Sequence, residues 1–171
     1  MKGKNMVIKR HFKKLITTTL VGITVLTPIN KLSYAQSKNL IFNNINIEQG
    51  ISQSTIEDIF QDSEGYIWLG TNDGLNRYNG YEFKHYKHDK YDKNSIANNY
   101  IVDIIEDKNG YIWVSTTNGL SRIDTDKDEI KNYYSKEYSG NLSNSNLWQI
   151  LCTKDNRLIA STIDGLNVYD K

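Results

Sequence analysis

The chain has 171 residues, enough for one domain with a buried core, and a formal net charge of +1. Seven of its 21 Lys and Arg residues lie in 1–35, which holds no acidic residue, so residues 36–171 carry 14 basic and 20 acidic side chains. An acidic body lacks the clustered Lys and Arg that bind phosphate backbones and anionic lipid. The composition therefore excludes a nucleic-acid partner.

The first 35 residues have the pattern of an export signal. Basic residues within 9–14 precede a mostly apolar stretch at 15–26, Pro28 ends that stretch, and Ser33 and Ala35 offer small side chains at the two positions that a signal peptidase reads. We expect a cleaved signal peptide over 1–35 and an exported or cell-surface protein. An uncleaved membrane anchor is the alternative, although a 12-residue helix rises only about 18 Å, short of the ~30 Å hydrocarbon core.

A short motif recurs at a fixed spacing in the rest of the chain. Residues 62–75 and 107–120 share the motif at a distance of 45 residues, and a degraded third copy ends at 161–166. A period in the mid-forties is typical of a repeat architecture, in which each unit buries its apolar face against a neighbour.

The first unit reads as four short strands. Alternating apolar residues bounded by Gly, Asn and Asp predict strands at 55–61, 66–71, 75–78 and 81–86. Asn79-Gly80 lies between two of them and is the typical signal of a two-residue hairpin. Residues 36–47 precede this unit and predict a linker followed by an additional outer strand over 40–47.

The second unit repeats this layout, and the third is shorter. Strands are predicted near 100–106, 111–116, 120–123 and 129–134, and a last unit runs from about 146 to 169 without a fourth strand. Four strands per repeat at this period describe a propeller blade. We therefore expect an all-β chain of four-stranded antiparallel meanders, an incomplete β-propeller of about three blades, with blade 1 at 48–90, blade 2 at 91–136 and a partial blade 3 at 137–171.

The motif of 62–75 and 107–120 resembles the two-component regulator propeller repeat. Its shared order is Asp, Gly, Tyr, Ile, Trp, an aliphatic residue, Gly or Ser, Thr, two residues, Gly and Leu, and 48–55 looks like the start of the family's first blade. In that family the repeats build the extracytoplasmic sensor of membrane-bound signalling proteins, usually as two propellers and an immunoglobulin-like domain. A histidine kinase or a diguanylate cyclase lies behind the membrane, and some members bind carbohydrates.

The resemblance implies a ligand-binding sensor fragment of a two-component type receptor, with the kinase or cyclase in sequence beyond Lys171. The alternative is a free exported lectin-like module that closes a propeller by oligomerising through its open blade edges. We find no catalytic constellation and expect no enzyme and no cofactor. The chain departs from the repeat at Ser115, which replaces Gly70, and at Asn156 and Ile159 in the third copy.

The repeated residues are interpreted as structural. We expect the two indoles to lie in the core between blades and the Asx-Gly pairs to form turns, so that the motif set is Gly65, Trp68, Gly74, Gly110, Trp113, Gly119 and Gly165. Arg77 and Arg122 occupy equivalent positions and are interpreted as structural, with an ion pair to an acid of the adjacent blade as one form that this role could take.

Ligand contact is predicted for tyrosines in or beside the polar linkers at 87–99 and 135–145, namely Tyr91, Tyr100 and Tyr138. The expected ligand is a carbohydrate or another small extracellular molecule.

No metal site is predicted. Residues 124–129 resemble the first half of a calcium loop but place Glu129 where glycine is required, and His85 and His88 lack a third ligand. Cys152 is the single cysteine and is interpreted as structural.

Overall fold

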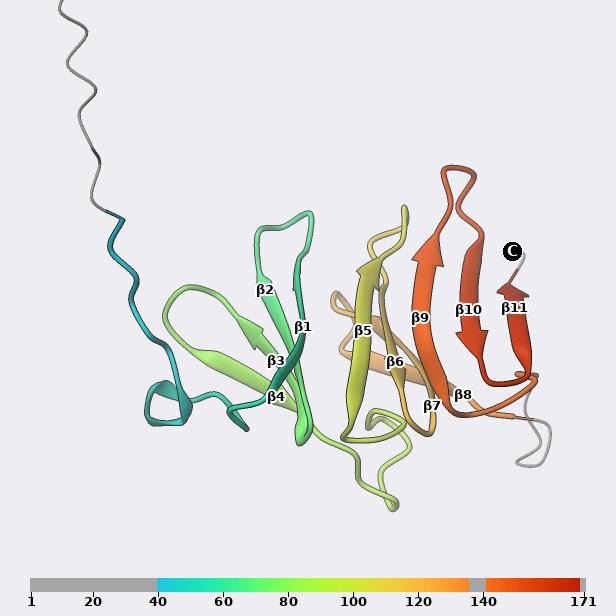
Figure 1. Cartoon of the computed structure of the whole chain (residues 1–171), viewed down its shortest axis with the longest axis horizontal. Helices are drawn as coiled ribbons and strands as arrows, with labels where there is room; N and C mark the ends of the chain where they lie inside the picture. Colours follow the sequence, from blue (N-terminus) through green and yellow to red (C-terminus); the bar gives the residue numbers. More distant parts are fainter. Residues whose placement is uncertain (1–39, 136–140, 170–171) are drawn as a thin grey trace, which may run out of the picture. The chain divides into compact units, whose positions relative to one another are not determined.

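The computed structural model describes residues 40–135 and 141–169, so the predicted signal peptide and Tyr138 lie outside the described residues (Figure 1). The chain divides into a unit of residues 1–42 and a unit of residues 43–171, and the second carries every described strand. The strands are β1 (Ile56–Gln61), β2 (Ile67–Thr71), β3 (Gly74–Tyr78), β4 (Phe83–Tyr86), β5 (Ile101–Glu106), β6 (Ile112–Thr116), β7 (Gly119–Asp124), β8 (Glu129–Tyr133), β9 (Leu147–Cys152), β10 (Leu158–Thr162) and β11 (Gly165–Tyr169).

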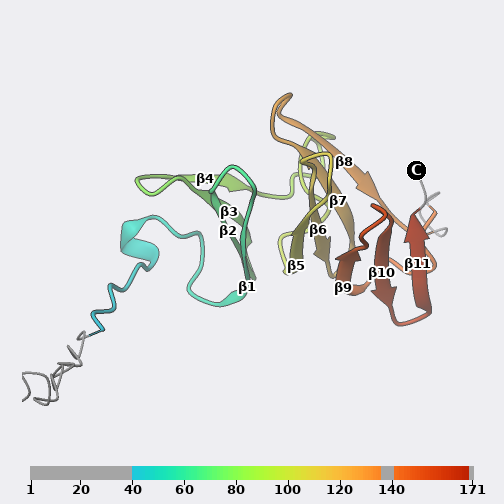
Figure 2. The ribbon, with the colours of Figure 1, turned by 90° about the horizontal axis from the view of Figure 1, so that it is seen from above.

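These strands form three antiparallel sheets, each paired in chain order. Sheet 1 is β1-β2-β3-β4, sheet 2 is β5-β6-β7-β8, and the described part of sheet 3 is β9-β10-β11. The first strands of the sheets are neighbours, with β5 between β1 and β9 (Figure 2). The predicted all-β class and the blade architecture are confirmed.

One turn recurs in all three sheets between the second and third strands. The Thr71 hydroxyl donates to the Gly74 carbonyl at 2.7 Å. Thr116 does the same to Gly119 at 2.7 Å, and Thr162 to Gly165 at 3.1 Å. The glycine at the end of the turn has a positive φ, 109° at Gly74, where a side chain would be strained. The conserved spacing of Thr and Gly inside this chain therefore follows from one turn geometry.

The β3–β4 hairpin forms, but its predicted two-residue loop is wrong. Tyr78 pairs with Phe83, so the loop has four residues, 79–82. The Asn79 side chain accepts hydrogen bonds from the N–H groups of Tyr81 at 2.8 Å and Glu82 at 2.9 Å. This Asx turn holds Tyr81 and Glu82 in the loop, whereas a two-residue loop would have left both residues in β4.

The outer strand predicted over 40–47 is also wrong. Residues 40–46 contain no strand, and residues Ile47–Gln49 form a short 3-10 helix. The Asn46 side chain accepts from Glu48 N at 2.7 Å, while the Gln49 side chain accepts from Asn46 N at 2.9 Å. This reciprocal cap satisfies the local backbone and competes with strand pairing.

The core lies between successive sheets and repeats from one interface to the next. We call the side of a sheet that packs on the following sheet its trailing face, and the side that packs on the preceding sheet its leading face. The trailing face of sheet 1 presents Trp68, Leu75 and Tyr86, and the leading face of sheet 2 meets it with Ile101, Ile104, Ile112, Val114 and Ile123. At the second interface the trailing residues are Trp113, Leu120 and Tyr133, and the leading residues are Leu147, Ile150, Leu158 and Ala160.

Polar bonds fix the sheets to each other at matching places. Asp58 accepts from Ile104 N at 2.8 Å, and Asp103 accepts from Ile150 N at 2.8 Å. Each bond joins the first strand of one sheet to the first strand of the next. A single geometric unit is therefore repeated twice in the described residues.

The linker before each sheet is held by a bond to that sheet's third strand, always 24 residues further on. Ser52 N donates to Asn76 at 3.0 Å, Ala97 N to Ser121 at 2.9 Å, and Ser143 N to Asn167 at 2.8 Å. The linkers that lead into sheets 2 and 3 also reach the preceding sheet, because Gly74 N donates to Asn99 O at 2.8 Å and Gly119 N to Ser145 O at 2.7 Å.

Candidate functional site

The first turn of each blade is organised by a buried aspartate. Asp62 accepts from the indole Nε1 of Trp68 at 2.7 Å and from Tyr66 N at 2.8 Å. Asp107 accepts from Trp113 Nε1 at 3.0 Å in the same way. The aspartate thus ties the tip of the turn to the core indole of its own sheet.

In the third sheet both members of the aspartate–tryptophan pair are replaced. Ile159 replaces the tryptophan and has no N–H to donate, and Thr153 replaces the aspartate. The Thr153 hydroxyl accepts from Arg157 N at 2.9 Å and so closes the turn without a carboxylate. Asn156 keeps the left-handed conformation of the glycine it replaces, with φ 66°.

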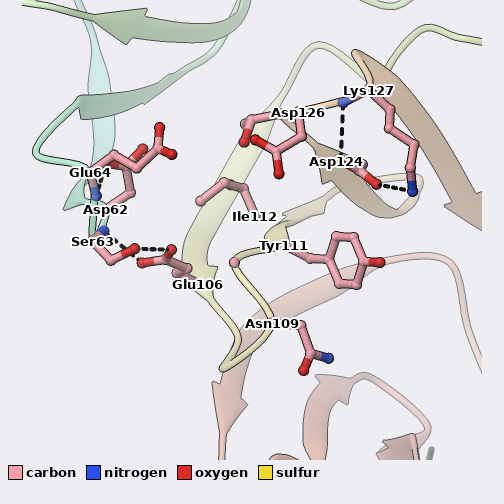
Figure 3. Close-up of a pocket in the computed structure, with 12 residues that line it drawn as sticks. Asp62, Ser63, Glu64, Glu106, Asn109, Tyr111, Ile112, Asp124, Asp126 and Lys127 are labelled. Atoms are coloured by element: carbon pink, nitrogen blue, oxygen red, sulfur yellow. Dashed lines mark hydrogen bonds and ion pairs between the residues drawn. The ribbon is translucent and has the colours of Figure 1, made fainter.

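A polar cleft lies between the turns of the first two sheets, with a volume of about 200 Å³. Its walls come from the β1–β2 turn on one side and from the β5–β6 and β7–β8 turns on the other, as Figure 3 shows. The wall residues cross-link, because the Glu106 carboxylate accepts from Ser63 N at 2.7 Å and from the Ser63 hydroxyl at 2.6 Å.

The cleft is rich in carboxylates, which come from both sheets. Asp62, Glu64, Glu106, Asp124 and Asp126 line it, together with Lys127. The Lys127 ammonium bonds Asp124 at 3.0 Å, which lowers the pKa of that carboxyl and raises the pKa of the lysine. Such a surface accepts hydrogen bonds from hydroxyl or ammonium groups.

The two equivalent arginines contact their own sheet, which agrees with the structural interpretation of these residues. The Arg77 guanidinium lies 3.6 Å from the centre of the Tyr66 ring and 3.4 Å from the Glu64 carboxylate. Arg122 lies 4.3 Å from the centre of the Tyr111 ring. Stacking on a tyrosine of the same sheet holds each guanidinium in place without an acid of the next sheet.

The predicted ligand tyrosines do not line this cleft. Tyr91 is 84% exposed and has Lys90 Nζ at 4.7 Å from its ring centre. Tyr100 is 39% exposed, and its hydroxyl donates to Glu57 at 3.4 Å. Tyr138 lies outside the described residues.

The motif residues lie in the turns and in the core. The two indoles of Trp68 and Trp113 are buried. The five glycines have a positive φ: Gly65, Gly74, Gly110, Gly119 and Gly165.

Sequence reasoning did not identify the cleft. Its central pair, Ser63 and Glu106, is separated by 43 residues. The positions equivalent to Glu106 are Gln61 and Cys152, so the carboxylate is not part of the repeated motif and gave no periodic signal.

The residues considered as metal ligands have other partners. His85 Nδ1 lies 2.8 Å from Asn76 Oδ1, and His88 Nδ1 lies 2.8 Å from Ile96 O. Residues 124–129 form the end of β7, the β7–β8 turn and the first residue of β8. Within 40–135 and 141–169 no three His, Cys, Asp or Glu side chains gather as a metal would require.

A second, apolar pocket of about 310 Å³ opens between sheets 2 and 3. Trp113, Tyr133 and Tyr169 lie in its wall, with ring centres 5.6 to 6.1 Å apart. Ala160 also lines it and stands where sheet 2 has Val114, so two methyl groups are absent from this interface. The smaller side chain of Ala160 leaves part of this space unfilled.

These blades, with their repeated turns and interfaces, define a propeller-repeat protein. The family model of the two component regulator propeller matches residues 50–73 and 95–118, one stretch in each of the first two units of the chain.

Relatives extend the similarity to signalling proteins. A 63-residue stretch is 43% identical to histidine kinase P4 of Formosa agariphila, covering 37% of this chain and 5% of the kinase. The extracellular domain of a hybrid two component system from B. thetaiotaomicron is 26% identical with a TM-score of 0.68, over 75% of this chain and 18% of that one. The extracellular domain of a one component system from the same organism is 24% identical with a TM-score of 0.59, over 70% of this chain and 17% of that one. This second match supports the fold alone.

The chain thus spans a small part of the length of these relatives. The described residues hold no helix that is long and apolar enough to cross a membrane.

Proposed function

We propose that this chain is the extracytoplasmic sensing part of a receptor of the two-component type. The observation that carries the proposal is the pair of propeller repeats in a chain that is 26% identical to the extracellular domain of a hybrid two component system. The export signal predicted over 1–35 supports the same location. We assign a binding role and no catalytic one, because the carboxylates of Asp62, Asp107 and Glu106 are used to hold turns together.

The ligand that we propose is a small extracellular molecule, a carbohydrate by preference. Sugar hydroxyls donate to carboxylates, and the cleft offers Glu64 and Asp126 from two different sheets. A ligand that bridges two sheets binds one relative arrangement of them better than another and so shifts the populations of the two arrangements. Tyr91 and Tyr100 remain proposed contacts for a ligand that reaches the linker rim.

The test is thermal unfolding of the purified chain in the presence of neutral, amino and acidic oligosaccharides. A ligand present at a hundredfold excess over its Kd stabilises the folded state by about 2.7 kcal/mol. We expect one sugar class to do this. Asp126→Asn is expected to reduce the effect of a sugar bound in the cleft, and Tyr100→Ala that of a sugar bound at the linker rim. Glu129→Gln changes an exposed acid outside the cleft and is the matched control. If no oligosaccharide shifts the unfolding curve, carbohydrate sensing by these blades is rejected.

A free exported module with lectin-like binding is the second candidate. It is favoured by one observation, the apolar residues that remain exposed on the outer sides of sheets 1 and 3, among them Ile59 and Leu166.

A further inference from the structure

The chain contains three Asn-Gly pairs, at 79–80, 109–110 and 118–119. In such a pair the glycine nitrogen can attack the side-chain amide of the asparagine, because glycine has no Cβ to obstruct the approach. The reaction closes a five-membered imide, which water then opens to an acid. All three asparagines are exposed, so access to water does not distinguish them.

The structure separates the three pairs at the attacking nitrogen. Gly110 N donates to Asp107 O at 2.9 Å inside its own turn, and Gly119 N donates to Ser145 O at 2.7 Å. Each of these N–H groups must leave its acceptor before the nitrogen reacts, which requires local opening. Gly80 N donates to no acceptor within 40–135 and 141–169, so this nitrogen needs no such opening.

Packing around the glycines adds a further difference. A Cβ on Gly119 would lie 2.9 Å from Ala97 Cβ and 2.9 Å from the Tyr134 ring, so rotation of this peptide displaces packed neighbours. A Cβ on Gly80 would meet no non-neighbouring atom within 4 Å. Gly110 is similarly open, so the hydrogen bond in its turn is what holds it in place.

The amide that is attacked is also prepared at Asn79. Its Oδ1 accepts from Tyr81 N at 2.8 Å and from Glu82 N at 2.9 Å. Attack places negative charge on this oxygen, and two backbone donors at these distances are the arrangement that stabilises an oxyanion. The side-chain oxygens of Asn109 and Asn118 accept no backbone N–H in the part of the chain that the structure describes.

We propose that Asn79 is a site of spontaneous deamidation in the β3–β4 loop. Gly80 N forms a bond to Cγ of Asn79 and gives its proton to water, the bond from Cγ to the side-chain nitrogen breaks, and that nitrogen leaves as ammonia with a proton from water. Water then opens the imide on either side of its nitrogen. Opening at Cγ yields aspartate, and opening at the main-chain carbonyl carbon yields isoaspartate, in which the chain runs through Cγ.

Both products change the contacts of the loop. Asn79 Nδ2 donates to the Glu82 carboxylate at 3.4 Å, and aspartate replaces this donor with a second negative charge. Isoaspartate takes Cγ into the main chain, so the side-chain acceptor of the Asx turn is lost. The loop joins β3 to β4, and Tyr86 of β4 stacks on the core indole of Trp68 at 5.5 Å, so deamidation loosens a hairpin that supplies the first interface.

The test follows deamidation of the purified full chain during incubation at mildly alkaline pH. Tryptic cleavage after Arg77 and Lys84 isolates Asn79 in residues 78–84, whereas cleavage after Lys108 and Arg122 leaves the other two asparagines in residues 109–122. Mass spectrometry of the two peptides measures the exchange of NH2 for OH. We expect Asn79 to react at least about tenfold faster than either other asparagine, because only those two wait for local opening.

Incubation in guanidinium chloride is the matched control, because unfolding removes every hydrogen bond that distinguishes the three pairs. The three rates should then become similar. Asn79→Gln retains an amide but would have to close a larger ring. In this variant residues 78–84 are expected to keep their mass, while residues 109–122 react as in the parent chain.

Two results overturn the proposal. One is reaction of Asn109 or Asn118 in the folded chain as fast as that of Asn79 or faster, which would show that the bonds on Asn79 Oδ1 protect the amide by fixing it. The other is a preference for Asn79 that persists unchanged in guanidinium chloride, which would assign the difference to the neighbouring sequence instead of the fold.

Discussion

The side chain of Asp58 in β1 accepts a hydrogen bond at 2.8 Å from the backbone of Ile104 in β5, and the side chain of Asp103 accepts from the same N–H at 3.0 Å. Two carboxylates from successive sheets therefore share one donor at the first interface. Burial raises the pKa of the Asp103 carboxyl, the Ile150 N–H opposes that rise, and the neighbouring Asp58 adds to it.

The stability of the fold should consequently depend on the ionisation of Asp103. Because its folded pKa lies above the ordinary value of 3.8, its contribution to stability is fully present below that value and is lost as the pH rises through the folded pKa. Asp103→Asn keeps an acceptor for Ile150 and cannot ionise. We expect the variant to gain stability relative to the parent as the pH rises through this window, measured by urea unfolding across a pH series. A constant difference between the two proteins would contradict the assignment.

The buried aspartate of the first turn should be important for stability. Asp62→Ala leaves the indole N–H of Trp68 and the N–H of Tyr66 without their acceptor, and the buried indole donor alone costs about 1–3 kcal/mol when unpaired. We expect a loss of that order in the free energy of unfolding. Thr153→Ala at the equivalent place in sheet 3 is the control and should cost less, because Ile159 has no side-chain donor. Equal losses would show that the indole bond is not what the aspartate provides.

Gly70 should not tolerate a side chain. A Cβ at this position would lie 2.7 Å from Ile101 Cγ2 and 3.1 Å from Ile101 Cβ, closer than packed carbons allow. We expect Gly70→Ala to destabilise the fold by about 1–3 kcal/mol, the usual cost of overpacking.

A double-mutant cycle with Ile101→Ala tests the cause. The two losses should be less than additive, because the second substitution removes the clashing Cγ2. At the second interface, sheet 2 has Ser115 at the position of Gly70. The residue of sheet 3 that is equivalent to Ile101 is Leu147, which is not branched at Cβ. Strict additivity would contradict the clash.

The apolar pocket between sheets 2 and 3 should accept two more methyl groups. Ala160→Val restores the residue that sheet 2 has as Val114, and at about 0.8 kcal/mol for each buried methylene the gain is at most about 1.6 kcal/mol. The reciprocal change, Val114→Ala, removes the same groups from a fully packed interface and should destabilise by at least as much. Thermal unfolding of both variants checks the prediction, and destabilisation by Ala160→Val would show that the pocket is already filled.

The strands could be predicted from the sequence because their ends are set by local chemistry. Thr71 and Gly74 close one turn and Asp62 organises another, and both sets recur with the period of the repeat. The predicted boundaries therefore agree with the structure to within one or two residues in sheets 1 and 2.

Other features depended on contacts that sequence periodicity does not contain. Asn79 was read as half of a two-residue loop, but its side chain captures two further backbone donors and lengthens the loop. The apolar run at 40–47 suggested a strand, whereas Asn46 and Gln49 cap a short helix there. The cleft was missed because Glu106 reaches Ser63 across an interface, at positions where the other repeats have different residues.

The bonds that span 24 residues have a consequence for how a signal could travel through these blades. Each linker is attached to its own sheet, at Ser52, Ala97 and Ser143, while Asn99 and Ser145 also hold the preceding sheet. The chain thus behaves as a row of nearest neighbours, in which a sheet responds only to the two beside it. If these blades sense a ligand as proposed, a molecule bound between sheets 1 and 2 would affect sheet 3 through sheet 2, which contacts both of its neighbours.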